Sequence, residues 1–116
     1  MSKQKLTTFG ERIRKLREEQ ELPQRKVAAI LDIDTSLLAK YERNERHPSK
    51  ELITKIAQLY KTDYSELVNE VLSDKIAYQI LEEEADTKIL RVAETKVEYL
   101  KQQDKSKNLK QTKNTK

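Results

Sequence analysis

The chain has 116 residues, of which 38% are charged and 35% hydrophobic, with one glycine, two prolines and no cysteine. A chain of this length buries one modest core, and the scarcity of glycine and proline predicts an all-α fold. The absence of cysteine excludes disulfides and thiolate chemistry. No apolar run approaches the length of a membrane span, and the opening segment MSKQKLTTFG lacks the apolar core of a signal peptide. We therefore expect a soluble, cytoplasmic protein.

Charge is distributed unevenly along the chain. Residues 1–64 carry 14 Lys and Arg against 10 Asp and Glu, residues 65–100 carry 4 against 9, and residues 101–116 carry 6 against 1. A polyanionic partner therefore belongs with the basic first segment, and the basic tail is suited to the same partner.

The first helix is expected over residues 9–21, after a flexible N-terminus at residues 1–8. Its inner face consists of Phe9, Ile13 and Leu16, at i, i+4 and i+7. Arg17 lies beside this apolar stripe, which is an unusual place for a cation. Pro23 breaks the helix and suits the first position of the next one.

Residues 24–42 are predicted to form two short helices joined by a tight turn, with Asp34 as the N-cap of the second. Their inward residues are Val27, Ala28, Leu31, Leu38 and Tyr41. The outer face of the second helix consists of Thr35, Ser36, Leu37, Ala39 and Lys40. Small and hydrogen-bonding groups with one leucine and one cation make a poor core but a good surface for reading a DNA groove. The pattern therefore predicts a helix-turn-helix.

Two further helices complete the expected domain. Ser49 caps the fourth helix, whose apolar stripe consists of Leu52, Ile53, Ile56, Ala57 and Tyr60. The fifth begins at Thr62 or Asp63 and directs inward Leu67, Val68, Val71 and Leu72. Five short helices with short connections form one compact domain, which we place at residues 9–72.

Residues 73–103 are expected to form a helical extension with a wide apolar face. Asp86 caps a last helix that runs to about residue 102, and its apolar side consists of Ile89, Val92, Ala93, Val97 and Leu100. Such a face dimerises, folds back on the first domain or binds another protein, and we favour a dimer interface built from these five residues. Residues 104–116 are Lys-rich and expected to be disordered, either gripping DNA without sequence preference or only adding solubility.

Five segments within residues 9–68 carry a common signature: IRKLR, PQRKVA, LDID, LAKYERNERHPS and LITKIA. In this register, without gaps, the chain resembles the Cro/C1-type helix-turn-helix domain of the Xre family of transcriptional regulators. The resemblance implies a five-helix, lambda-repressor-like fold and a homodimer that binds an inverted-repeat operator in double-stranded DNA. Where the family often has glycine, this chain has Glu21, Asp32 and Asn44. Asp and Asn tolerate positive φ well, and Glu tolerates it less.

The resemblance also implies roles for individual residues. The helix over residues 35–42 lies in the major groove, with Thr35, Ser36 and Lys40 at base-contacting positions. Leu37 and Ala39 suit thymine methyl groups, and Lys40 suits guanine. The residues expected to contact phosphates are Gln24, Arg43, Arg46 and Lys50. Arg17 and Glu42 match a charge pair that ties the first helix to the third.

Interpretations without a role in DNA binding remain open for several of these residues. Lys40 and Arg43 are alternatively ordinary solvated charges, and Gln24 is alternatively only a good helix former. A metal site is not expected, because His47 is the single histidine and no cysteine accompanies it.

Catalysis is also not expected, since the chain offers no nucleophile–base pair and no phosphate-binding glycine loop, and no cofactor is implied. The alternative to a DNA-reading regulator is an antitoxin or adaptor. Its helices in residues 73–103 would bind a protein partner, with DNA binding secondary.

Overall fold

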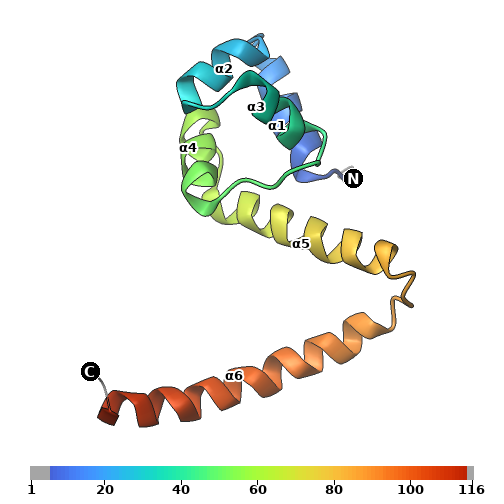
Figure 1. The fold of residues 1–116 in the computed structure, drawn as a ribbon, viewed down its shortest axis with the longest axis vertical. Helices are drawn as coiled ribbons and strands as arrows, with labels where there is room; N and C mark the ends of the chain where they lie inside the picture. The colour runs from blue at the N-terminus through green and yellow to red at the C-terminus, as the bar shows by residue number, and fades with distance from the viewer. Residues whose placement is uncertain (1–5, 115–116) are drawn as a thin grey trace. The chain divides into compact units, whose positions relative to one another are not determined.

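The computed structural model describes residues 6–114, with side chains to residue 105, and this part of the chain is helical without strands (Figure 1). The helices are α1 (Phe9–Glu19), α2 (Gln24–Leu31), α3 (Thr35–Glu42), α4 (Lys50–Tyr60), α5 (Tyr64–Glu82) and α6 (Ile89–Asn114). The chain divides into two compact units, Met1–Tyr78 and Gln79–Lys116. Among the described helices, none is long and apolar enough to cross a membrane.

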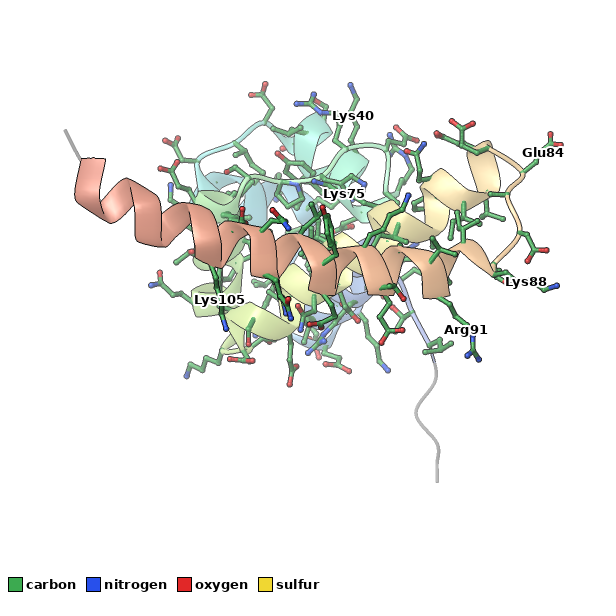
Figure 2. All side chains as sticks on the ribbon, turned by 90° about the horizontal axis from the view of Figure 1, so that it is seen from below. Lys40, Lys75, Glu84, Lys88, Arg91 and Lys105 are labelled. Carbon is green, nitrogen blue, oxygen red and sulfur yellow. The ribbon has the colours of Figure 1, made fainter. Side chains whose placement is uncertain are left out.

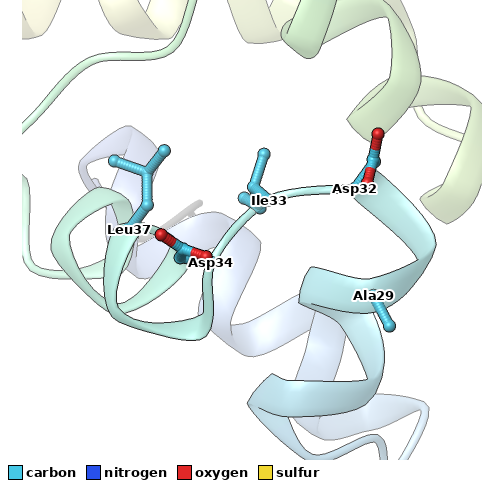
Figure 3. Close-up of a pocket in the computed structure, with 5 residues that line it drawn as sticks. All are labelled: Ala29, Asp32, Ile33, Asp34 and Leu37. Carbon is cyan, nitrogen blue, oxygen red and sulfur yellow. The ribbon is translucent and has the colours of Figure 1, made fainter.

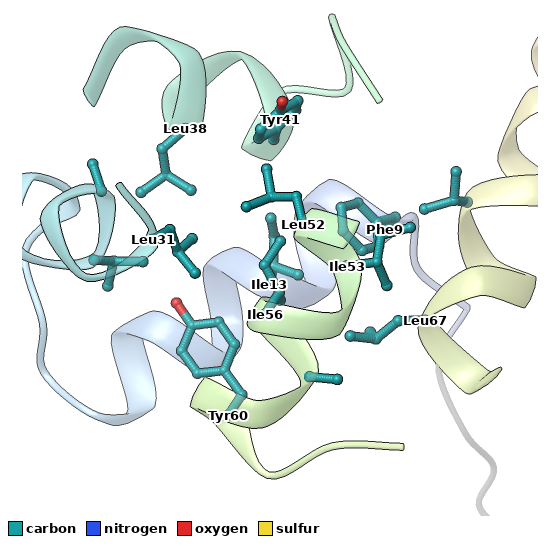
Figure 4. Packing of buried hydrophobic residues seen from close by; sticks show 14 residues of the cluster. Phe9, Ile13, Leu31, Leu38, Tyr41, Leu52, Ile53, Ile56, Tyr60 and Leu67 are labelled. Atoms are coloured by element: carbon teal, nitrogen blue, oxygen red, sulfur yellow. The ribbon is translucent and has the colours of Figure 1, made fainter. Parts of the chain in front are cut away.

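One apolar core holds the first unit together (Figure 4). Its buried side chains come from α1 to α5 and are Phe9, Ile13, Val27, Ala28, Leu31, Leu38, Tyr41, Leu52, Ile53, Ile56, Ala57, Tyr60, Leu67 and Val71. Every inward residue predicted for the first four helices is in this core, except Leu16, which is only partly buried against it. The apolar periodicity of the sequence therefore located these helix faces correctly.

Helix α5 differs from the expectation at two positions. Leu72, predicted to face inward, is 47% exposed, and Val68 is only partly buried. The third buried residue of α5 is Asp74, which continues the i, i+4, i+7 series begun by Leu67 and Val71. Leu72 lies about 100° further round the helix than Val71, which carries it out of the core.

Asp74 is buried because it binds the start of α1. Its Oδ2 accepts a hydrogen bond of 2.7 Å from the backbone N–H of Phe9. This N–H belongs to the first turn of α1 and has no partner within its own helix. A carboxylate at a helix N-terminus is also favoured by the helix dipole. Asp74 therefore ties α5 to α1.

The second half of the chain differs from the sequence prediction in where its helices end. Helix α5 runs unbroken through the expected boundary between residues 72 and 73. Helix α6 continues to Asn114, past the end expected at about residue 102. This segment lacks glycine and proline and is rich in Lys and Gln, which are good helix formers. Residues 115–116, and residues 1–5 of the expected flexible N-terminus, lie outside the described residues.

The three positions where the family often has glycine all adopt left-handed backbone conformations. The φ angles of Glu21, Asp32 and Asn44 are 57°, 61° and 63°. Asp and Asn are the side chains that best tolerate this region, whereas Glu at residue 21 bears more of the steric cost. These turns therefore keep the geometry that glycine would allow.

A group of acidic side chains on α5 surrounds Arg12 of α1. Arg12 lies 2.9 Å from an oxygen of Glu66 and 3.7 Å from Oε2 of Glu70. The other oxygen of Glu70 is buried and makes no hydrogen bond. Burial raises the pKa of Glu70, more than Arg12 lowers it. Folding therefore opposes ionisation of Glu70.

We expect Glu70→Gln to stabilise the protein at neutral pH by less than about 1 kcal/mol, since Glu70 is partly exposed. A carboxyl with a raised pKa stabilises the fold only while protonated, so its contribution is lost as pH rises through that pKa. Urea unfolding at pH 4 and pH 7 should show the variant gaining stability over the native protein only at pH 7. Glu66→Gln, which removes the other carboxylate beside Arg12, is the control. An equal change for Glu70→Gln at both pH values would contradict this account.

Candidate nucleic-acid interface

Helix α3 is fixed in the core by one side and leaves the other side open. Leu38 and Tyr41 are 1% and 5% exposed, and Glu42 is also buried. The predicted base-reading residues Thr35, Ser36 and Lys40 are exposed, and Leu37 and Ala39 are partly buried at the flanks of the open side. Lys40 extends into solvent (Figure 2). The five predicted residues therefore share one outward surface.

The charge pair implied by the resemblance is present at the buried end of α3. Arg17 Nε donates to Glu42 Oε2 at 2.7 Å, and a second guanidinium nitrogen donates to Glu42 Oε1 at 3.0 Å. The two side chains are 11% and 3% exposed. The hydrogen bonds that Arg17 donates to Glu42 raise the pKa of Arg17, despite the opposing effect of burial. A third donor group of Arg17 reaches the carbonyl oxygen of Leu22 at 2.9 Å.

Gln24 belongs to the same network. Its Nε2 donates to Glu42 Oε1 at 2.9 Å, and the side chain is partly buried. The amide that was predicted to bind a phosphate is therefore already held by the end of α3. This contact orients the first residue of α2 relative to α3.

The loop after α3 holds two arginines in different surroundings. Arg43 donates to both carboxylate oxygens of Glu45, at 2.8 and 3.1 Å, and this contact raises the pKa of Arg43 and lowers that of Glu45. Arg46 and Lys50 are exposed. Ser49 caps α4 as predicted, accepting from the N–H of Leu52 at 3.2 Å. Arg43 is therefore already engaged in an ion pair, and a phosphate that binds it would have to share or displace Glu45.

Asn44 attaches this loop to α1, which the sequence analysis did not predict. Its Oδ1 accepts from the N–H of Gly10 at 2.9 Å, and its Nδ2 donates to Thr8 Oγ1 at 2.8 Å. Thr8 also forms a reciprocal capping box with Glu11 at the start of α1. Asn44 therefore combines the left-handed backbone of a glycine with two side-chain hydrogen bonds.

The apolar residues predicted for a dimer interface are exposed on α6. Ile89, Val92, Val97 and Leu100 are 44%, 54%, 49% and 56% exposed, and Ala93 is exposed too. Leu90 and Tyr99 are also exposed, so apolar groups extend over ~180° of the helix circumference. This face is wider than the five predicted residues.

A family model described as helix-turn-helix matches residues 13–67. Among solved structures, the chain is similar to the restriction-modification controller protein C.AhdI from Aeromonas hydrophila, with 34% identity over 51% of this chain and 89% of that chain, and a TM-score of 0.47. It is similar to the P22 c2 repressor in complex with a synthetic operator, with 21% identity over 53% of this chain and 94% of that chain, and a TM-score of 0.51.

The clp gene regulator ClgR from Corynebacterium glutamicum is 20% identical over 76% of this chain and 88% of that chain, with a TM-score of 0.49. The comparison with curated proteins gave no match. The likeness to the P22 c2 repressor concerns the fold, and it confirms the all-α, lambda-repressor-like architecture expected from the sequence.

Proposed function

The chain belongs to the Cro/C1-type helix-turn-helix family of DNA-binding transcriptional regulators, and from this premise we propose that it reads a specific operator as a homodimer. The observation that carries the proposal is the division of α3 into a fixed side and an open side. Leu38 and Tyr41 anchor the helix, so its polar residues face outward without side-chain rearrangement. Regulators of this family are not enzymes, and the mechanism we propose is occupancy of DNA.

In this proposal α3 enters the major groove with its N-terminal half at the base edges. Thr35 and Ser36 offer hydroxyl groups that donate or accept, and Lys40 offers donors for guanine. Leu37 and Ala39 present apolar surface to thymine methyl groups. In this proposal these five residues read the sequence of the bound DNA.

Phosphate contacts then position the helix without reading bases. Arg46 and Lys50 support this role because both are exposed near the loop that follows α3. Arg43 contributes when it exchanges Glu45 for a phosphate, whereas Gln24 keeps its contact with Glu42 and offers its remaining amide proton. The proposed site is cytoplasmic DNA, which suits a chain without cysteine.

We expect Ser36→Ala and Lys40→Ala each to reduce affinity for the preferred operator by about 10- to 100-fold and to relax base preference at particular positions. Lys50→Ala should weaken binding to all sequences by a similar factor and reduce the salt dependence. Lys55→Ala, which removes an exposed charge from α4, is the control. Fluorescence anisotropy with the operator and its single-base variants measures each effect. Equal losses on every sequence for Lys40→Ala would exclude it as a base reader.

The homodimer in this proposal forms through α6, because two copies bury apolar surface that one copy leaves exposed. Two recognition helices related by a two-fold axis read half-sites about 10 bp apart, or a multiple of that spacing. We take Ile89, Val92, Ala93, Val97 and Leu100 as the interface.

A variant with aspartate at both Val97 and Leu100 is expected to be monomeric. Its operator affinity should fall at least about tenfold, because a single half-site offers few contacts. Sedimentation velocity and anisotropy measure the two effects. The control is Thr95→Asp combined with Gln102→Asp, which adds the same two charges on the other side of α6. A variant that stays dimeric and binds DNA normally but loses regulation in cells would favour the alternative function, in which α6 binds a protein partner.

A further inference from the structure

A shallow hollow lies between the end of α2 and the start of α3 (Figure 3). It is lined by Ala29, Asp32, Ile33, Asp34 and Leu37. Leu37 belongs to the outward surface of α3, so the hollow borders the proposed base-reading face. In Figure 3 the Asp34 carboxylate lies beside Leu37, whereas Asp32 lies at the other end of the hollow, beyond Ile33.

Asp34 stands at the N-cap of α3, but its carboxylate does not cap the helix. Its backbone is extended, with φ −68° and ψ 145°, and its side chain makes no capping hydrogen bond. Instead, its carbonyl oxygen accepts from the N–H groups of Leu37 and Leu38, at 3.1 Å each. No ion pair of Asp34 occurs among the side chains described to residue 105. The carboxylate is exposed and retains its hydrogen-bond acceptors.

An unneutralised carboxylate at this place opposes DNA binding in general, because phosphates and most base edges repel it. Guanine presents N7 and O6 acceptors in the major groove, thymine presents O4, and adenine places its N7 acceptor beside its amine. Cytosine presents only the N4 amine, which is a donor. Cytosine is therefore the base for which the carboxylate gains a hydrogen bond without facing an acceptor on the same base.

We propose that Asp34 is a specificity-determining residue that accepts a hydrogen bond from the N4 amine of a cytosine at one edge of the sequence read by α3. This inference rests on the proposed function, which supplies the groove and the orientation of α3. Ile33 and Leu37 form the apolar part of the hollow and receive the methyl group of a thymine next to that cytosine. Asp34 selects cytosine by repelling the other three bases as well as by binding this one.

The test is selection from a randomised duplex pool with the full chain, Asp34→Asn and Asp32→Asn. Asparagine is as good an N-cap as aspartate and tolerates the left-handed backbone at residue 32, so both variants keep the fold. Both remove one negative charge from the same hollow, which makes Asp32→Asn the matched control. Asp34→Asn should change the preferred base at one position from cytosine to adenine, because an amide pairs with adenine N6 and N7. Asp32→Asn should leave that preference unchanged.

A second measurement removes the amine from the DNA instead of the carboxylate from the protein. A cytosine analogue without the exocyclic amine at the selected position should cost the native protein about 10- to 100-fold in affinity. The Asp34→Ser variant also keeps an N-cap side chain. Its affinity should fall by no more than about twofold when the same cytosine is replaced by the analogue.

Unchanged preferences in Asp34→Asn, or the absence of a selected cytosine, would overturn this inference while leaving the proposed function intact. Selection that enriches no sequence with the native protein would overturn both, since no base is then read. The same change of base preference in Asp34→Asn and Asp32→Asn would assign the effect to the charge of the hollow and also overturn the inference.

Discussion

Glu42→Gln is expected to lower the free energy of unfolding by about 3–5 kcal/mol, because it leaves the Arg17 guanidinium buried without a counter-charge. The side chains of Arg17 and Glu42 are 11% and 3% exposed, which places the pair with buried rather than surface ion pairs. An exposed pair would be worth under about 1 kcal/mol. The short contacts at 2.7 and 3.0 Å and the third bond to the Leu22 carbonyl make Arg17 dependent on this arrangement.

Urea unfolding followed by circular dichroism measures this loss. The matched control is the double replacement of Arg17 by methionine and Glu42 by leucine, which removes both charges and keeps apolar volume. Because the double variant leaves no unpaired buried charge, it should lower the free energy of unfolding by less than Glu42→Gln alone. A cost for Glu42→Gln below about 1 kcal/mol would show that water or Gln24 compensates the cation, contrary to this account.

Gly10→Ala should destabilise the protein by about 3 kcal/mol, at the upper end of the range for overpacking a core. A Cβ at residue 10 would lie 2.5 Å from the carbonyl oxygen of Tyr41, 2.6 Å from that of Glu42 and 2.7 Å from Asn44 Oδ1. Two of these three atoms are backbone, so relief requires α1 and the end of α3 to separate. The helix propensity gained by alanine, about 1 kcal/mol, is too small to offset this.

The control for this prediction is Lys15→Ala, an exposed replacement on the same helix, which should change stability by less than about 0.5 kcal/mol. Adding Asn44→Ala to Gly10→Ala tests the cause. That variant removes the amide oxygen but leaves both carbonyls in place, so it should not restore stability. A Gly10→Ala protein as stable as the native one would mean that the close approach of α1 and α3 is not required.

The part of the fold that the sequence predicted depends on short-range rules. Apolar spacing identified the buried faces of α1 to α4, because each of these helices turns one stripe to a single core. Ser49 acts as the predicted cap, and Asp32 and Asn44 adopt the left-handed conformations that their side chains tolerate. The Arg17–Glu42 pair followed from the family resemblance and from the odd position of an arginine beside an apolar stripe.

The features that the sequence analysis missed depend on contacts between distant segments. Asp74 is buried only because the N–H of Phe9, 65 residues earlier, needs an acceptor. The spacing of Leu67, Val71 and Asp74 would have indicated that Asp74 is buried, had charged residues been allowed at inward positions. The same spacing would have placed Leu72 outside the core.

In the candidate site, the sequence predicted the outward residues of α3 but not the intramolecular contacts of the residues around them. Gln24 and Arg43 have intramolecular partners, Glu42 and Glu45, which no local pattern specifies. Asp34 was identified as a cap from residue preference, and it does stand at the N-cap of α3, but its side chain makes no capping bond. Residue preference at the N-cap does not distinguish a carboxylate that caps the helix from one that remains free to bind another group.

The central claim, that the outward side of α3 reads DNA sequence, is tested most directly by selecting bound duplexes from a randomised pool at two salt concentrations. The account predicts an enriched inverted repeat whose sequence is the same at both concentrations, although total binding falls as salt rises. Enrichment should relax at particular positions when Ser36 and Lys40 are replaced by alanine. Retention of DNA without any enriched sequence, lost at the higher salt, would show that charge alone holds the DNA and would contradict the account.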